Sequence, residues 1–437
     1  MDQYQELYEI LRKEMKPALG CTGPIGICFV AAQAYDAIGG EIKSIKAIGF
    51  GPKSDDVAFP GTEMLGAEMA AALGAVCGDP KAGLEVLHSV TPEGELKARK
   101  VAETVELIPS DDPSLLHKRT IIIETDKGTG TATIQGAQDG LIYKAGTDKD
   151  GNTTVYLDKE PDLLNQAGHT PLMKYKIKDF YEFATTYPIE KFAFIDEAIE
   201  MNSKMSDYVL THDDVSIGIG RQLLATANPS PVSRAKAAAA AACEGRMSGV
   251  SLPIMSVGGK GNVGIATSMP LISLAKDLGS KHEDLVRALV ASSLLGTAVI
   301  HRIGKAPTMC SCEVAATMGV AVGSVILQGG TEQQAENAIQ NLIPNVFGVV
   351  CDGAKLACAL RMASGTAMAL DAAELALKGI RLANNQGVLD VNADASIDFL
   401  GEFALNDMLD SDHKLEDKMM KKRKIFPLMT FTDRQKI

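Results

Sequence analysis

The stretch that decides the fold is EDLVRALVASSLLGTAVIHRI, residues 283–303. Its apolar residues occupy most faces of a helical wheel rather than one stripe, which is typical of a helix buried inside a bundle. Four other stretches are also predicted to be helical: SRAKAAAAAACEGRM, EVAATMGVAVGSVIL, EQQAENAIQNLI and LACALRMASGTAMALDAAELALKGIRLA, at residues 233–247, 313–327, 332–343 and 356–383. From about residue 179 onward the sequence therefore predicts almost unbroken helix.

The first part of the chain has a different pattern. Its predicted elements are helices over residues 4–15, 24–40 and 63–76 and a strand over residues 44–50. Between residues 100 and 158, short strand-like stretches such as RTIIIET are separated by Gly, Asp and Asn, as in hairpins. The expected fold class is α+β, a mixed α/β N-terminal part with a short-stranded sheet followed by a large all-helical bundle. A boundary near residue 175 gives domains 1–175 and 176–437.

Charge and hydropathy limit the classes of partner. The 437 residues carry a net charge of −12 without an extended basic stretch, so we expect neither nucleic acid nor an anionic membrane as a partner. The N-terminal MDQYQELYEILRKEMK resembles a charged amphipathic helix rather than a signal peptide. No continuous apolar run reaches the roughly 18 residues of a membrane span. We expect a cytoplasmic protein, where thiols stay reduced, and a homo-oligomer is compatible with the sequence.

Four of the eight cysteines fall in one short region, within TMCSCEVAAT and VCDGAKLAC: Cys310, Cys312, Cys351 and Cys358. On a continuous helix, Cys351 and Cys358 would share a face about 10.5 Å apart, which suits an iron–sulfur cluster better than one zinc ion. Gly353 could break such a helix, so zinc stays open. Since free cysteine is often simply buried, we assign that role to three others, Cys28, Cys77 and Cys243.

A further cysteine lies in GCTGPIG, where Pro24 favours the first turn of a helix. Cys21 would then lie beside a helix N-terminus, whose N–H groups stabilise a thiolate or a substrate carboxylate. The alternative is a buried cysteine next to an ordinary helix cap.

The segment SVGGKGNVGIAT, residues 256–267, has four glycines among twelve residues and leads into a helix. Its backbone N–H groups could converge on an anion. The segment is not a phosphate-binding P-loop, because Gly261 follows Lys260 where that motif requires Ser or Thr. It also lacks the βαβ context of a dinucleotide site, so a small carboxylate or amino acid is the expected ligand. A flexible interhelical loop is the alternative.

Taken in order, PALGCTGPIG, FPGT, GKGNVGI, CSC and CDGAKLAC resemble the motifs of L-cysteine desulfidases, relatives of the iron–sulfur-dependent L-serine dehydratases. The resemblance implies a [4Fe-4S] cluster held by three cysteines with one iron open. The matching positions are Cys351, Cys358 and one of Cys310 or Cys312, with Cys312 favoured. Cys21 matches the N-terminal cysteine expected near the substrate. This chain departs from the family in having CSC for the usual CGC.

The implied reaction is β-elimination from a small L-amino acid, with L-cysteine giving sulfide, pyruvate and ammonia. Cys21 is the first candidate for the base and Lys305 the second. The expected substrate-binding residues come from two helix starts: Thr22, Gly23, Gly259, Lys260, Gly261, Asn262 and Gly264. An L-serine dehydratase and a non-catalytic protein with four cysteine ligands remain alternatives. We expect no pyridoxal phosphate, because the all-helical half does not suit that cofactor.

Overall fold

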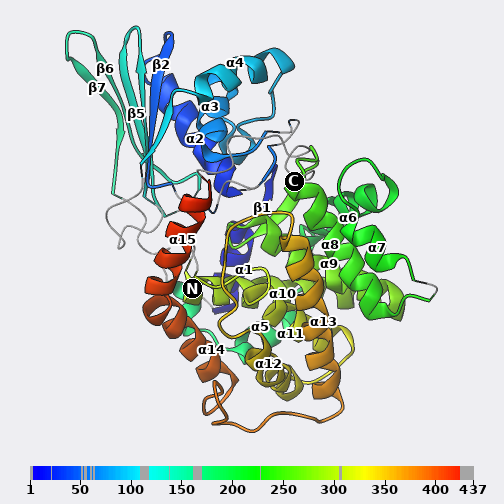
Figure 1. Cartoon of the computed structure of the whole chain (residues 1–437). Helices are drawn as coiled ribbons and strands as arrows, with labels where there is room; N and C mark the ends of the chain where they lie inside the picture. Colours follow the sequence, from blue (N-terminus) through cyan, green and yellow to red (C-terminus); the bar gives the residue numbers. More distant parts are fainter. Residues whose placement is uncertain are drawn as a thin grey trace.

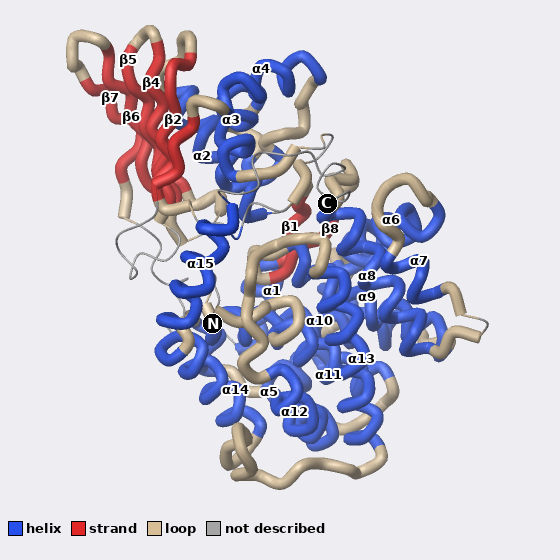
Figure 2. Tube along the Cα trace, in the orientation of Figure 1, coloured by secondary structure: helices blue, strands red, loops and turns tan. Residues whose placement is uncertain are grey.

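The computed structural model confirms an α+β fold with a large helical part (Figures 1 and 2). A sheet and three helices form one lobe, and the remaining helices pack below it as a bundle. The structure describes residues 3–20, 22–50, 53, 57–59, 62, 64–108, 118–136, 138–160, 170–226, 228–304 and 308–423.

The sheet of the upper lobe has six strands in the order β3-β2-β4-β5-β6-β7. Only the β2–β3 pair is parallel. The strands are β2 Ile42–Ile48, β3 Val105–Ile108, β4 Arg119–Thr125, β5 Gly128–Ile134, β6 Leu141–Asp148 and β7 Thr153–Asp158. Residues 101 and 102, predicted as strand, instead end helix α4, Pro92–Ala102.

Helix α2, Thr22–Asp36, packs on the sheet, and α3, Ala67–Cys77, packs on α2. Glycines in two strands let α2 and the residue after it approach closely. A Cβ on Gly130 would lie 2.0 Å from the carbonyl oxygen of Ala34, and one on Gly146 would lie 2.2 Å from that of Ala37. The C-terminal end of α2 is therefore packed tightly against the sheet of the upper lobe.

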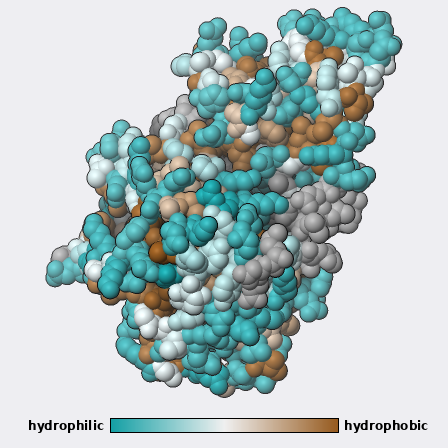
Figure 3. Space-filling model, turned by 180° about the vertical axis from the view of Figure 1, so that it is seen from behind, coloured by the Kyte–Doolittle hydropathy of each residue, from teal (hydrophilic) through white to brown (hydrophobic). Residues whose placement is uncertain are grey.

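The bundle is built around α8, α9, α10 and α11. Its helices are α5 Ile177–Thr186, α6 Ile195–Thr211, α7 Ile219–Leu224, α8 Pro231–Met247, α9 Gly261–Leu278, α10 His282–Ile303, α11 Ala315–Leu327, α12 Glu332–Val346, α13 Cys358–Leu377, α14 Ala393–Glu402 and α15 Leu409–Arg423. Among the described helices, α10 alone is long and apolar enough to cross a membrane, but its apolar window is 83% buried inside the molecule. The opening stretch is thus the core helix that its pattern predicts. The outer surface, seen from behind in Figure 3, is mostly hydrophilic.

The N-terminal segment runs from the bundle into the sheet lobe. Helix α1, Gln3–Glu14, buries Leu7 and Leu11 in the helical core. Strand β1, Met15–Ala18, pairs antiparallel with β8, Ile254–Val257, a strand that the sequence analysis did not predict. Division into domains at residue 175 stays a prediction, while the packing places α1 and β1 with the bundle. This crossing brings the start of α2 to the glycine-rich segment.

Candidate active site

The clustered cysteines meet at a short backbone pairing. An antiparallel bridge joins Met309 to Val350. On either side of it, the N–H of Cys310 donates to Val349 O at 2.8 Å and that of Cys351 donates to Thr308 O at 2.8 Å. Cys310 and Cys351 therefore flank the same bridge at diagonal positions, although 41 positions separate them in the sequence.

Cys351 and Cys358 do not share a continuous helix. Gly353 has a φ of +93°, and α13 begins only at Cys358. The thiol of Cys358 lies 3.7 Å from the carbonyl oxygen of Gly353. The break that Gly353 could introduce is therefore present, and the loop folds Cys358 back toward Cys351.

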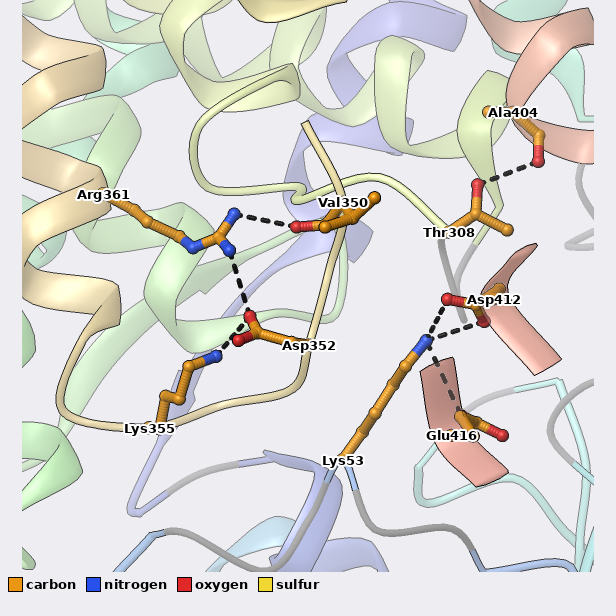
Figure 4. A network of polar contacts seen from close by, with 9 residues as sticks. All are labelled: Lys53, Thr308, Val350, Asp352, Lys355, Arg361, Ala404, Asp412 and Glu416. Carbon is orange, nitrogen blue, oxygen red and sulfur yellow. Dashed lines mark hydrogen bonds and ion pairs between the residues drawn. The ribbon is translucent and has the colours of Figure 1, made fainter. Parts of the chain in front are cut away.

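Charged side chains hold the loop of residues 351–357, called the cysteine loop, in place (Figure 4). The Arg361 guanidinium donates to Val350 O at 2.8 Å and to the Asp352 carboxylate at 3.1 Å. Lys355 also pairs with Asp352. From the upper lobe, Lys53 accepts a hydrogen bond at its carbonyl oxygen from the backbone N–H of residue 354. The loop is thus held from α13 on one side and from the upper lobe on the other.

The thiols of Cys310, Cys312, Cys351 and Cys358, together called the thiol group, lie within electrostatic reach of one another. A hydrogen bond from Cys312 lowers the pKa of Cys310 to about 6, with further help from the positive charge of Arg361. Burial, and then the charge on Cys310, raise the pKa of Cys358 to about 12. The same two causes raise the pKa of Cys351. Cys310 is thus the thiolate of the group, and its charge acts on the other three thiols.

The donor set suits thiolate-bound iron. Its members are sulfur atoms, and Cys310 and Cys358 are 4% and 5% exposed. Soft thiolates are the ligands of iron–sulfur clusters. Among the residues described, no three His, Cys, Asp or Glu side chains form a group at the spacing of a single bound metal ion. The fit therefore rests on the chemistry of the donors.

The glycine-rich segment forms a tight turn followed at once by α9. Gly258 and Gly259 both have positive φ, 60° and 72°, and Val257 and Lys260 pair across them. Positive φ at both central residues defines a type I′ turn, which glycine adopts without strain. Because α9 begins at Gly261, the second half of the segment is helix rather than loop.

This turn lies within electrostatic reach of the cysteines. The charge of Lys260 contributes to lowering the pKa of Cys351, against the larger effect of burial. Asn262, which is 6% exposed, accepts a hydrogen bond of 2.7 Å from Arg246. Arg246 also donates to the carbonyl oxygen of Gly20 at 2.5 Å. The segment before Cys21 and the start of α9 therefore meet at Arg246, and the charge at this helix start reaches the thiol group.

Comparison with known proteins shows the family to which the chain belongs. A family model described as serine dehydratase alpha chain matches residues 81–415. A UPF0597 protein of Clostridium botulinum strain Okra is 32% identical over 430 residues, covering 96% of this chain and 99% of the relative. A UPF0597 protein of Caldanaerobacter subterraneus is 32% identical, covering 95% of this chain and 98% of the relative. A UPF0597 protein of Bacteroides fragilis strain YCH46 is 30% identical, covering 96% of this chain and 98% of the relative.

The chain belongs to the serine dehydratase alpha chain family. The matched span contains the four clustered cysteines and the glycine-rich turn, and Cys21 lies outside it. The part of the site that the structure describes best is therefore also the part that the family model covers.

The structure describes some of the other predicted site residues but not all of them. Cys21 and Lys305, the two candidate bases, lie outside the described residues, and so does the side chain of Thr22. Gly23 is in the first turn of α2. Gly259 is exposed at the tip of its turn, and Gly264 packs against the carbonyl oxygen of Met255.

The cysteines assigned to simple burial differ among themselves. Cys28 and Cys243 are buried, as predicted, and burial raises the pKa of Cys28. Cys77, at the end of α3, is only half-buried. Cys243 lies close enough to the thiol group to raise the pKa of Cys312.

The sequence analysis missed three residues of this serine dehydratase alpha chain family member. Arg246 is 2% exposed at the end of an alanine-rich helix, and charge inside such a run was a usable signal. Arg361 and Glu313 face each other at 3.7 Å beside Cys310. Burial, followed by the charge of Cys310, raises the pKa of Glu313 to about 7. A carboxyl group that titrates near neutral pH is suited to proton transfer.

Proposed function

We propose that the protein is a lyase that catalyses β-elimination from a small L-amino acid, with L-cysteine as the preferred substrate. One observation carries the proposal: the charge of Lys260 at the glycine-rich turn reaches Cys351, so the turn and the thiol group lie within electrostatic range of each other. The family supports a dehydratase-like reaction. The proposed products from L-cysteine are sulfide, pyruvate and ammonia, and the proposed location is the cytoplasm.

The proposed cofactor is a [4Fe-4S] cluster bound by Cys351, Cys358 and Cys310. We propose Cys310 as the third ligand rather than Cys312, which the sequence analysis favoured, because Cys310 and Cys351 flank the same backbone bridge. Its low pKa also suits a ligand that must be deprotonated. When bound with one open iron, such a cluster supplies Lewis-acid chemistry for the leaving group.

The chain itself would position the substrate and move the proton. The start of α9 offers N–H groups and the positive end of a helix dipole to a carboxylate, and Lys260 adds a positive charge at the same place. Cys21 remains the proposed base, supported by the position of its neighbour Gly20 on Arg246. Lys305 is the second proposed base.

The test is turnover by anaerobically purified, iron-reconstituted protein. We expect equal amounts of sulfide and pyruvate from L-cysteine, and retention of iron but loss of most turnover in Cys21→Ala, because that change removes a proton-transfer group rather than a ligand. Cys77→Ser is the control, because Cys77 is a half-buried thiol in the upper lobe. This variant should keep both its iron and its turnover. Iron-loaded protein that forms no product from L-cysteine or L-serine would refute the proposal.

The second candidate is an L-serine dehydratase, which the family description favours. The same site would then eliminate water instead of sulfide. The two candidates differ in the ratio of kcat/KM for L-cysteine and L-serine. A ratio above one supports the desulfidase, and a ratio below one supports the dehydratase.

A further inference from the structure

Arg246 is a buried cation in the last turn of α8. It is 2% exposed and is among the largest fully buried side chains of the molecule. One terminal nitrogen donates to Asn262 Oδ1 and the other to Gly20 O. Within the described residues its Nε has no hydrogen-bond partner. A buried donor without a partner costs stability unless a ligand satisfies it.

No described acidic side chain forms an ion pair with Arg246. The nearest acidic residue in the sequence, Glu244, is engaged elsewhere. Its carboxylate accepts from the backbone N–H groups of residues 218, 219 and 220 at 2.6, 2.9 and 3.0 Å. Buried charges are normally paired, so Arg246 is in a place where an anion is expected.

The guanidinium lies against the first residue of α9. A Cβ on Gly261 would come within 2.3 Å of Nη2, 2.4 Å of Cζ and 2.6 Å of Nε. Glycine at this position therefore makes room for the guanidinium at the helix start. The first N–H groups of a helix have no partner within the helix, so the unpaired Nε and these N–H groups share one small region.

The chemistry of this region selects a carboxylate. A guanidinium presents pairs of N–H donors that match the two oxygens of a planar carboxylate. The helix start adds positive potential, and the charge of Lys260, the residue before the helix, reaches Cys351. An amino acid is only a few ångströms long, so a carboxylate held here would leave its side chain near the thiol group.

We propose that Arg246, together with the start of α9, binds the carboxylate of the substrate. The identity of the substrate rests on the proposed function, whereas the carboxylate site rests on Arg246 itself. Arg246 is thus a substrate-binding residue that also holds Gly20 and Asn262 in place.

The test compares ligands that differ by one group, using the full-length, iron-reconstituted protein. L-alanine has no β leaving group, so it binds without being consumed. Ethylamine is the same molecule without its carboxylate, and propionate lacks the amine. Calorimetry and the ligand-induced shift in Tm should show binding of L-alanine and propionate, and no binding of ethylamine. Stabilisation by ethylamine equal to that by L-alanine, or no binding of either carboxylate, would overturn the inference.

Variants then identify the group. Arg246→Gln should weaken L-alanine binding at least about tenfold, the loss expected for a charged hydrogen-bonded contact. Arg246→Lys keeps the charge but not the paired donors, so it should bind with intermediate affinity. Arg234→Gln, on the same helix but paired with Asp277 at 2.8 Å, is the matched control and should bind normally. Unchanged affinity in a folded Arg246→Gln protein would refute the assignment.

Two outcomes separate this inference from the proposed function. If Arg246→Gln does not fold, the wild-type ligand series and Arg246→Lys decide, and unchanged affinity in Arg246→Lys refutes the paired-donor assignment. Carboxylate binding by wild-type protein without turnover contradicts the lyase and leaves the site standing. Turnover with an unchanged KM in Arg246→Gln contradicts the site and leaves the lyase standing.

Discussion

At the scale of single residues, the site depends on which thiol carries charge. Cys310 receives a hydrogen bond from Cys312 and the field of Arg361, so its pKa falls to about 6 although the residue is buried. Cys351 and Cys358 have raised pKa values, for which burial is the main cause. A bound metal would reverse that effect, because it stabilises thiolates. The sequence predicted which cysteines are candidates for the site. It could not predict the order in which their thiols ionise, because that order follows from contacts across the fold.

The first prediction separates ligands from nearby thiols. Cys351→Ser, Cys358→Ser and Cys310→Ser should each abolish iron binding. Cys243→Ala should keep it, although Cys243 lies close to Cys312. Iron per chain after anaerobic reconstitution is the measurement. If Cys310 and Cys312 both prove essential, the site has four protein ligands and no open iron, which contradicts a catalytic cluster.

A second prediction concerns pH and Glu6 on α1. Hydrogen bonds from Lys174 at 2.5 Å and from Tyr175 lower the pKa of Glu6. A lowered pKa stabilises the fold above the unfolded value near 4.5 and loses that effect as the pH falls through the folded value. Glu6→Gln should therefore reduce Tm at pH 7, and the difference from wild type should shrink as the pH falls below the unfolded value.

The control for this pH effect is Glu190→Gln, which removes an exposed carboxylate. Its Tm difference from wild type should stay small at every pH. A Tm difference for Glu6→Gln that grows as the pH falls would contradict the assignment.

At the scale of elements, the turn between β8 and α9 brings distant parts of the chain together. The glycine spacing predicted an anion-binding segment before a helix, and the structure adds β8 and its pairing with β1. That pairing joins residues about 240 positions apart, and short strands of four residues carry little periodic signal of their own. The helix starts were therefore predictable, whereas their meeting was not.

The third prediction tests the close packing of this element. A Cβ on Gly264 would lie 1.9 Å from the carbonyl oxygen of Met255, so Gly264→Ala must push α9 away from β8. We expect a loss of at least about 2 kcal/mol of unfolding free energy. Gly296→Ala on α10 is the control, because its nearest neighbour, at 3.1 Å, is a side-chain methyl. Equal stability of the two variants in denaturant titrations would contradict this packing.

At the scale of the whole molecule, the upper lobe and α13 enclose the cysteine loop, and the upper lobe also contacts α15. The upper lobe supplies Lys53, whose amino group contacts the Asp412 carboxylate at 2.6 Å and that of Glu416 at 3.6 Å on α15 (Figure 4). The α+β class and the buried helix over residues 283–303 could be read from hydrophobic patterns. The enclosure of the cysteine loop could not be predicted from the sequence, because single ion pairs between remote segments leave no pattern in one sequence.

The fourth prediction concerns this enclosure. Lys53→Met removes the contacts to α15 and should speed hydrogen exchange there about tenfold, with a smaller effect on residues 351–357. Lys414→Met, which removes an exposed pair with Asp410, is the control and should leave exchange in the cysteine loop unchanged. Indistinguishable exchange in wild type and Lys53→Met would show that the contact does not hold α15.

The central claim is that Cys310, Cys351 and Cys358 bind an iron–sulfur cluster. Metal analysis of anaerobically expressed and purified protein tests it most directly. We predict brown protein with about four iron and four acid-labile sulfide atoms per chain, the composition of a cubane cluster. Exposure to air should lower the iron content first at the open position. One zinc per chain, with neither iron nor labile sulfide, would contradict the account.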